Sequence, residues 1–510
     1  MAITGCTTQR IDSPASGGGD NLQSGEALSG FESYYTQTLT WSQCAAEQVG
    51  QTGDYAAYFC TQIQAPLDWS DPASDSISLA VAVHETSSDN ALFYNLGGPG
   101  SEAVSSLVSF VENTLSSTAS SSFDVVAVDP RGIGQSTQVN CLTDAEKDEL
   151  FSGNSTRANL AELQNTIDFY QEVGEQCLAN SGDLVANVDG YSVARDFDLV
   201  RSLLGQESFN YLGYSYGTYL GAVYAELFSD RVGRMVLDGA IDPTIDYDSL
   251  GGLQAIGFEE SLDHWLELAA TGEFEGFNTG GLSAEELKFQ LRQFLAGLQD
   301  TPLETRDPER SLTYAQALNG IARCLYLEAN YPRLGLALAD AYAGDGTDLL
   351  TLADSYRGRS ADGTYSNSVD VYMAASALDF SLVDGYDDAD LRAWLQNAQA
   401  SLAANPVFGE VGMFAQAQWA RWPVQGKHNR SEFEVTDKDM NTILVIGTTQ
   451  DPATPYVMAE SLVEMLPSGL LLKVNGWSHA AYRQSASTCV VETVDGYFLT
   501  GKVANFECNS

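Results

Sequence analysis

The sequence predicts an α/β protein whose central sheet is mostly parallel and is covered by helices on both faces. One observation is a series of short apolar segments separated by stretches of helical periodicity. Strands buried on both faces of a parallel sheet require such continuous apolar runs. A second observation is that this strand signal fades over one long internal stretch and then resumes, as expected for a helical insertion. The predicted strands cover residues 91–94, 123–128, 209–212, 235–237, 442–446 and 470–474.

An earlier strand is predicted over residues 77–83. Apolar side chains recur there at every second position, at Ile77, Leu79, Val81 and Val83. A period of two is typical of a strand with one buried face and one solvated face. We therefore expect this strand to be half-exposed.

The helical insertion is predicted over residues 246–425. Its clearest helix begins with a capping box, Ser283 to Glu286, followed by a leucine-rich apolar stripe. Further helices are expected over 314–327, 332–342 and 391–402. An insertion that leaves and re-enters one sheet can cover the carboxyl ends of its strands, where open α/β sheets bind ligands. The expected organisation is a tether over 1–30, a core over 31–245 and 426–510, and a cap over 246–425.

The composition excludes several classes of partner. The formal net charge is −45, so polyanions such as nucleic acid would be repelled, whereas cationic groups such as peptide amino termini would be attracted. A solvated acidic surface on an exported protein also explains this charge. No apolar run has the length of about 18 residues that a membrane helix needs.

The amino-terminal segment indicates export. Residues 3–6, Ile-Thr-Gly-Cys, look like the end of a bacterial lipoprotein signal, which makes Cys6 a candidate lipidation site. The alternative is that Cys6 is incidental. The Ser- and Gly-rich segment that follows is typical of a flexible tether. We expect an extracellular or cell-surface protein, attached to a membrane if Cys6 carries a lipid.

The remaining cysteines also fit an oxidising compartment. None has the C-x-x-C spacing of a metal or redox site. Six fall into three local couples, Cys44–Cys60, Cys141–Cys177 and Cys489–Cys508, which leaves Cys324 over. We predict three disulfides that each close a short loop, with buried free thiols as the alternative.

One pentapeptide, residues 213–217, has the pattern G-x-S-x-G with Ser215 at its centre. It lies between the predicted strand 209–212 and a helical stretch over 218–227. A serine on a sharp strand-to-helix turn needs glycine-sized neighbours on both sides, because the turn is strained and crowded. Ser215 is therefore the candidate nucleophile.

A nucleophilic serine needs a histidine base that is oriented by a carboxylate. Of the four histidines, His479 follows the strand 470–474 by a tight loop, whereas His84, His264 and His428 are expected to be structural or solvated. Asp451 follows the strand 442–446 and lies between the serine and the histidine in the chain. We predict a triad of Ser215, Asp451 and His479; in the alternative, Asp451 only caps the next helix.

An acyl-transfer site also needs two N–H donors for the oxyanion. One is expected from Tyr216, directly after the nucleophile. The other is expected from Gly98, in the glycine-rich loop after the strand 91–94. This loop lacks the Lys-Ser/Thr ending of a phosphate loop. No metal or cofactor is expected in this chemistry.

These motifs together carry a resemblance. Residues 97–100 (GGPG), 128–136 (VDPRGIGQS), 213–221 (GYSYGTYLG), 451–455 (DPATP) and 476–479 (GWSH) resemble the exported actinobacterial α/β-hydrolases related to tripeptidyl aminopeptidase and proline iminopeptidase. The resemblance covers about residues 44–508. It implies an α/β-hydrolase fold with an inserted cap, the same triad, and release of residues from a peptide's free amino terminus. Leu96 departs from the pattern, since proline iminopeptidases have His there; a cap cysteine pair near Ala377 and Trp419 is also missing.

The function predicted from these residues is a serine exopeptidase acting on short peptides. Such an enzyme must bind a substrate ammonium, and the candidate carboxylates are Glu102, Asp242 and Asp379, although in so acidic a chain a surface charge is the more common explanation for each. A carboxylesterase or another small-molecule hydrolase with the same triad is the alternative, since a fold and a triad do not determine the substrate. A peptide-binding protein with an inactive hydrolase site is the third possibility.

Overall fold

The fold is built on one mixed sheet. The computed structural model describes residues 27–50, 55–153, 158–381 and 385–510. Within them, ten strands form a sheet in the order β1-β2-β3-β5-β4-β6-β7-β8-β9-β10. All pairs from β5 to β10 along this order are parallel, and the three pairs at the other edge are antiparallel. The predicted α/β fold with a mostly parallel sheet is thus confirmed.

The strand bounds agree closely with the apolar segments of the sequence. The short strands β1 and β10 and the long strand β2 were not predicted, since β2 includes polar residues and a proline. The strands are β1 Ser42–Gln43, β2 Tyr58–Pro66, β3 Ser76–His84, β4 Ala91–Asn95, β5 Asp124–Val128, β6 Phe209–Tyr214, β7 Val232–Asp238, β8 Ile443–Thr448, β9 Gly469–Asn475 and β10 Glu507–Asn509.

Strand β3 differs from the prediction of a half-exposed strand. Its central residues are buried on both faces. Leu79 and Val81 contact one apolar core, while the intervening Ala80 and Ala82 contact the other. The alternation in β3 is therefore one of large and small side chains on two buried faces. A hydrophobicity pattern alone does not distinguish this arrangement from a strand with one buried and one exposed face.

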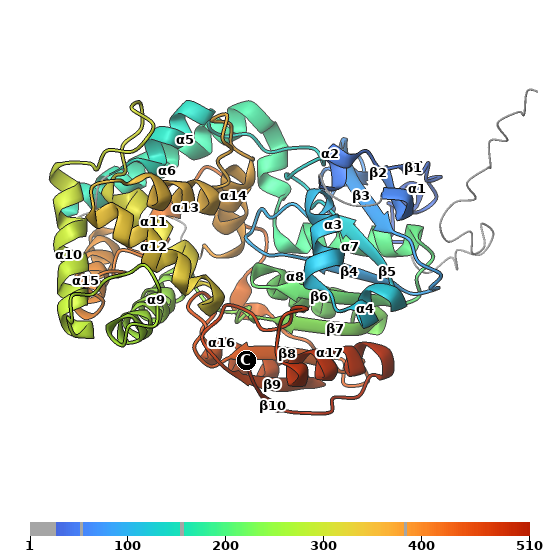
Figure 1. The fold of residues 1–510 in the computed structure, drawn as a ribbon. Coiled ribbons are helices and arrows are strands. Elements are labelled where there is room, and N and C mark those ends of the chain that lie inside the picture. The colour runs from blue at the N-terminus through green and yellow to red at the C-terminus, as the bar shows by residue number, and fades with distance from the viewer. Residues whose placement is uncertain (1–26, 51–54, 154–157, 382–384) are drawn as a thin grey trace, which may run out of the picture.

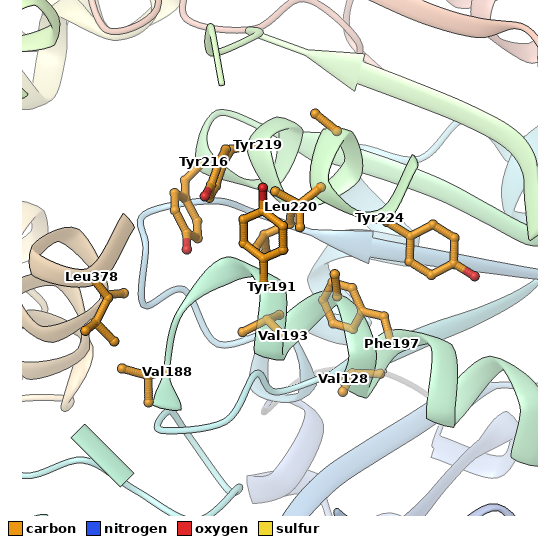
Figure 2. Packing of buried hydrophobic residues seen from close by; sticks show 14 of the residues in the cluster. Val128, Val188, Tyr191, Val193, Phe197, Tyr216, Tyr219, Leu220, Tyr224 and Leu378 are labelled. Atoms are coloured by element: carbon orange, nitrogen blue, oxygen red, sulfur yellow. The ribbon is translucent and has the colours of Figure 1, made fainter. Parts of the chain in front are cut away.

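Helices cover both faces of the sheet (Figure 1). One core lies between the sheet and α7 (Gly190–Leu203), α8 (Tyr216–Leu227) and α16 (Tyr456–Met465), with α1 (Glu32–Tyr35) at its edge. Figure 2 shows its tight part, where side chains of α7 interleave with those of α8. The other core lies beneath α2 (Ala46–Val49), α3 (Leu107–Ser109), α4 (Ser117–Ser122) and α17 (Thr488–Thr500).

Between β7 and β8 the described chain forms helices, which gather to one side of the sheet with an apolar core of their own (Figure 1). The predicted capping box at Ser283 is present and opens α10. The helices of this cap are α9 Tyr247–Ala270, α10 Ala284–Asp300, α11 Tyr314–Leu325, α12 Tyr331–Tyr342, α13 Thr347–Arg357, α14 Ser368–Asp379 and α15 Asp388–Ala404.

Two helices that precede the nucleophile also lie with the cap. They are α5 (Asp144–Phe151) and α6 (Leu160–Ser181), in the stretch that the sequence assigned to the core. Leu163 and Ile167 of α6 share a small apolar cluster with Trp394 and Phe414 of the cap. An amphipathic pattern shows that a helix buries one face, but not which layer that face contacts. The cap is therefore made from two separate parts of the chain.

Three disulfides join Cys44 to Cys60, Cys141 to Cys177 and Cys489 to Cys508, the pairs that the sequence predicted. Cys324 is a buried free thiol in α11. Cys6 and most of the predicted tether lie outside the described residues. A search of the described helices finds none with the length and apolar character to span a bilayer.

Candidate active site

The motif-bearing loops meet at one edge of the sheet. The glycine-rich loop follows β4, Ser215 follows β6, Asp451 follows β8 and His479 follows β9. Strands β4, β6, β7, β8 and β9 run parallel in one continuous order. Their carboxyl ends therefore lie side by side, and the four loops converge from distant parts of the chain.

Ser215 lies on a strained turn between β6 and α8. Its backbone has φ 54° and ψ −124°, a conformation that non-glycine residues rarely adopt. The turn is tight, since a Cβ at Gly213 would lie 2.5 Å from the Gly217 carbonyl oxygen. A Cβ at Gly217 would lie 2.8 Å from the Asn95 carbonyl oxygen. Both glycines of the motif are thus sterically required, and Ser215 itself remains partly exposed.

His479 is oriented by Asp451. Its Nδ1 lies 2.9 Å from Oδ1 and 3.0 Å from Oδ2 of a fully buried carboxylate. This hydrogen bond places the proton on Nδ1 and leaves Nε2 as an acceptor. The imidazole is 13% exposed, so a substrate can reach it. The pair has the geometry of a general base and its orienting acid.

Asp451 is held by several further donors. Its carboxylate accepts hydrogen bonds from the N–H groups of Ala453 (2.9 Å), Thr454 (2.8 Å) and Ala480 (3.1 Å). The Thr454 hydroxyl donates to it at 2.9 Å and also lies 3.2 Å from His479 Nδ1. The sequence analysis did not single out Thr454, although a hydroxyl three residues after an acid is a common local partner. These bonds hold the carboxylate in place beside the imidazole.

Burial of His479 opposes its charged form, but the charge of Asp451 and the hydrogen bond with it outweigh this effect. They raise the pKa of His479 above its usual 6.5. A raised pKa strengthens the imidazole as a base and stabilises the imidazolium that forms when it accepts a proton.

Asp238, the last residue of β7, was not predicted as a site residue. Its carboxylate accepts hydrogen bonds from the N–H groups of Ala481 (3.0 Å) and Tyr482 (2.6 Å), just after His479. Its carbonyl oxygen accepts one from the Ser215 N–H at 3.0 Å. Burial raises the pKa of Asp238 to about 6. One residue thus links the loop of Ser215 to the loop of His479.

The glycine-rich loop lies directly against the nucleophile elbow, as we call the strained turn of residues 213–217. A Cβ at Gly97 would lie 2.6 Å from the Tyr214 carbonyl oxygen and 2.9 Å from Ser215 Cβ. Among the described residues, none accepts a hydrogen bond from the N–H of Gly98 or Tyr216. Unpaired N–H groups beside a nucleophile are what an oxyanion hole provides.

The cap contacts the histidine loop. The His479 N–H donates to the carbonyl oxygen of Tyr326 at 2.7 Å, and the two rings meet edge to face with centroids 5.4 Å apart. Leu327 and Ser478 form an isolated antiparallel bridge. The segment after α11 therefore packs against His479 and holds its loop.

The three carboxylates predicted to bind a substrate ammonium lie in different surroundings. Glu102 is half-buried and lines a polar cavity of about 410 Å³ next to the glycine-rich loop. Asp242 is also half-buried, but one of its oxygens is engaged by both the N–H and the hydroxyl of Thr244. Asp379 is only 2% exposed, and its carboxylate accepts hydrogen bonds from Tyr216, Tyr219 and Gly190. Because this side chain is buried and both of its oxygens already accept hydrogen bonds, Asp379 does not fit the role of ammonium ligand.

Comparison with known proteins agrees with this geometry. The family model described as alpha/beta hydrolase fold matches residues 90–308, and the model described as TAP-like protein matches residues 405–508. A carboxylesterase B of Mycobacterium tuberculosis is 33% identical over 471 residues, which cover 91% of this chain and 88% of the relative. The chain belongs to the TAP-like α/β-hydrolase family.

Two further relatives of this TAP-like α/β-hydrolase are peptidases by name. The serine protease Hip1 of M. tuberculosis is 30% identical over 479 residues, 91% of this chain and 89% of the relative. The tripeptidyl aminopeptidase of Streptomyces lividans is 25% identical over 478 residues, 91% and 85% of the two chains. The protein is therefore a hydrolytic enzyme, and its relatives include both peptidases and an esterase.

Proposed function

We propose that this TAP-like α/β-hydrolase is a serine exopeptidase that releases residues from the free amino terminus of short peptides. The observation that carries the proposal is the hydrogen-bonded pair of His479 and Asp451 at the sheet edge that also presents Ser215 on its strained turn. Relatives named serine protease and tripeptidyl aminopeptidase support the peptidase class.

The proposed reaction proceeds in two steps. His479 Nε2 takes the proton of the Ser215 hydroxyl as its oxygen attacks the scissile carbonyl, and the N–H groups of Gly98 and Tyr216 stabilise the oxyanion. The imidazolium then gives this proton to the departing amine, which leaves an ester on Ser215. In the second step His479 takes a proton from water, whose hydroxide attacks the ester, and returns a proton to Ser215.

Glu102 is the proposed ligand of the substrate's amino terminus. Ser105 donates to one of its oxygens at 2.7 Å, and no described lysine or arginine pairs with it. Lys147 lines the same cavity, but its ammonium lies 2.6 Å from Asp370. Glu102 lies five positions after Gly97, a chain reach of at most about 18 Å, which the hydrogen-bonded turn from Ser101 to Gly97 shortens. A peptide segment of a few residues spans such a distance.

A carboxylesterase activity is the second candidate. It is favoured by the 33% identity to carboxylesterase B, and the triad chemistry is the same for an ester. The two candidates differ in their need for a substrate ammonium, since an ester without an amino group gains nothing from Glu102.

The first test is the nucleophile. We expect Ser215→Ala to lower kcat by about 10⁴-fold or more on every substrate, because removal of the nucleophile disables the whole triad. Labelling by a fluorophosphonate should be lost at the same time. Activity retained within tenfold would show that Ser215 is not the nucleophile.

The second test separates the substrate classes. Fluorogenic di- and tripeptidyl amides are compared with the same peptides acetylated at the amino terminus and with short-chain esters. Loss of the ammonium should lower kcat/KM by about tenfold to a hundredfold, as expected for a charged hydrogen bond of about 1.5–3 kcal/mol. Glu102→Gln should remove this preference. Asp144→Asn, at a carboxylate on the same cavity that accepts the Tyr365 N–H, is the matched control and should retain it. Turnover of esters alone would overturn the peptidase proposal.

We also propose that the protein is exported and held at the membrane by a lipid on Cys6. The disulfides and the relatives named above are consistent with export. Cys6→Ser should move the protein from the detergent phase to the aqueous phase in a detergent partition experiment. If the unchanged protein and Cys6→Ser both partition into the aqueous phase, the proposal of a lipid anchor is wrong.

A further inference from the structure

A buried polar network connects the cap to the residue after the nucleophile. Asp379 is the last residue of the cap helix α14. Its carboxylate accepts a hydrogen bond from the Tyr216 hydroxyl at 2.5 Å, from the Tyr219 hydroxyl at 3.3 Å and from the Gly190 N–H at 2.9 Å. Cap, α7 and α8 therefore meet at one side chain.

Tyr216 is placed to transmit movement to the elbow. It is the first residue of α8 and directly follows Ser215. Its ring contacts those of Tyr219 and Phe380, with centroids 5.6 and 6.1 Å apart, and Figure 2 shows Leu378, the residue before Asp379, on the same side. The elbow leaves no free space around its glycines. In such close packing, a shift of the Tyr216 side chain displaces its own N–H and the turn at Ser215.

Among the described residues, no lysine or arginine forms an ion pair with the Asp379 carboxylate. The groups facing it are Asp189 at the start of α7, Tyr191 of α7, the two tyrosines of α8, and Arg430. The Arg430 guanidinium donates to the Asp379 backbone oxygen at 3.0 Å and lies over the rings of Phe380 and Tyr219. Burial, followed by the charge of Asp189, raises the pKa of Asp379 to about 7. The Tyr216 hydroxyl, at 2.5 Å, makes the shortest hydrogen bond to this carboxylate, and the Gly190 N–H donates to both of its oxygens.

We propose that Asp379 is a positioning residue that couples the docking of cap helix α14 to the geometry of the oxyanion site, through its hydrogen bond to Tyr216. The inference rests on the proposed roles of Ser215 and Tyr216. The cap then contributes to the rate of acylation as well as to the choice of substrate, because an undocked α14 leaves the Tyr216 side chain without its anchor.

The test uses the full chain with a short-chain ester, so that it does not depend on peptidase activity. Asp379→Asn and Tyr216→Phe should each lower kcat and the rate of fluorophosphonate labelling about tenfold, with KM within about twofold. The double variant should be no slower than the slower single variant, because both changes remove one interaction. Tyr219→Phe is the matched control, since it removes the longer hydroxyl contact to the same carboxylate, and it should stay within twofold of the unchanged enzyme.

Three outcomes decide the inference. Unchanged labelling by both single variants would overturn it, and so would additive losses in the double variant. An equal loss in Tyr219→Phe would show a general packing effect instead. Thermal unfolding is followed in parallel; if Asp379→Asn does not fold, Tyr216→Phe still removes the same bond and leaves Asp379 its other partners. Failure of the proposed peptidase function looks different, because the unchanged enzyme would then still label and turn over esters but would not cleave peptides. Failure of the proposed role of Ser215 would show as labelling that persists in Ser215→Ala.

Discussion

Replacement of Gly97 by alanine tests whether the glycine-rich loop supports catalysis by its close contact with the elbow. Gly97 has φ +93°, and an added Cβ would lie 2.6 Å from the Tyr214 oxygen, 2.9 Å from Ser215 Cβ and 3.1 Å from the Tyr216 nitrogen. Real Cβ atoms do not approach backbone this closely, so the loop must move away from Ser215. The neighbouring Gly98 moves with it.

Gly97→Ala is expected to lower both the stability of the protein and its kcat. Alanine at this φ costs about 1–3 kcal/mol of stability as backbone strain, and the overpacked contact costs about 1–3 kcal/mol more. Withdrawal of one oxyanion donor lowers kcat about 10²–10³-fold, or about 2.7–4 kcal/mol of transition-state stabilisation. KM should change little, because the oxyanion forms only during the reaction.

Gly344→Ala is the matched control. Gly344 has φ +103° just after α12, with no atom within 4 Å of an added Cβ. It should lose stability through strain and keep its kcat. Both variants are compared by urea unfolding and by steady-state kinetics on one ester and one peptide substrate. A folded Gly97→Ala enzyme with kcat within threefold of the unchanged enzyme, or an equal loss of kcat in Gly344→Ala, would refute the argument.

Four further predictions follow from the site and its supports. Asp238→Ala should lower kcat about 10²-fold, because it releases the loop that carries His479. Asp238→Asn should lower kcat less, since its amide oxygen still accepts a hydrogen bond; equal kcat values for the two variants would argue against this anchoring role. The base must be neutral, so kcat/KM should fall as pH drops through a pKa above 6.5, and a pH profile without this acid limb would contradict the raised pKa of His479. Burial raises the pKa of the Asp129 carboxyl to about 6. Its contribution to the free energy of unfolding is therefore full below about pH 3.8, its usual pKa, and is lost as pH rises through 6. Asp129→Asn should flatten this dependence of stability on pH, measured by urea unfolding at about pH 4 and about pH 7. Replacement of Cys489 and Cys508 by serine should cost about 2–4 kcal/mol of stability with kcat unchanged, and an unaltered urea midpoint would exclude a stabilising role.

The sequence anticipated the nucleophile elbow well, because its features are local. The glycines at 213 and 217 and the strand before Ser215 express a steric requirement that a few adjacent residues fulfil. The pairing of Asp451 with His479 was also predicted, since each follows an apolar strand and parallel strands bring their carboxyl ends to one edge; the structure shows the two side chains hydrogen-bonded. The three cysteine couples, close in sequence, are joined in the structure.

Other features depended on contacts between distant segments. Asp238 reads as the end of a strand, and only the folded chain brings the N–H groups of Ala481 and Tyr482 to it. Glu102 and Asp379 looked alike in the sequence as acids near the site, yet one lines an open cavity and the other is buried against Tyr216. The membership of α6 in the cap was likewise decided by its partners.

The sequence by itself thus determined the α/β sheet, the strained turn at Ser215 and the positions of Ser215, Asp451 and His479 at strand ends, because periodicity, glycine sterics and strand ends are properties of short segments. Only the tertiary structure decided which carboxylates are accessible, which hold other loops in place and where the cap contacts Tyr216 and His479. Burial and hydrogen-bond partners arise from residues that are far apart in the chain, as the 163-residue separation of Tyr216 and Asp379 illustrates. A local sequence pattern therefore cannot predict this burial or these partners.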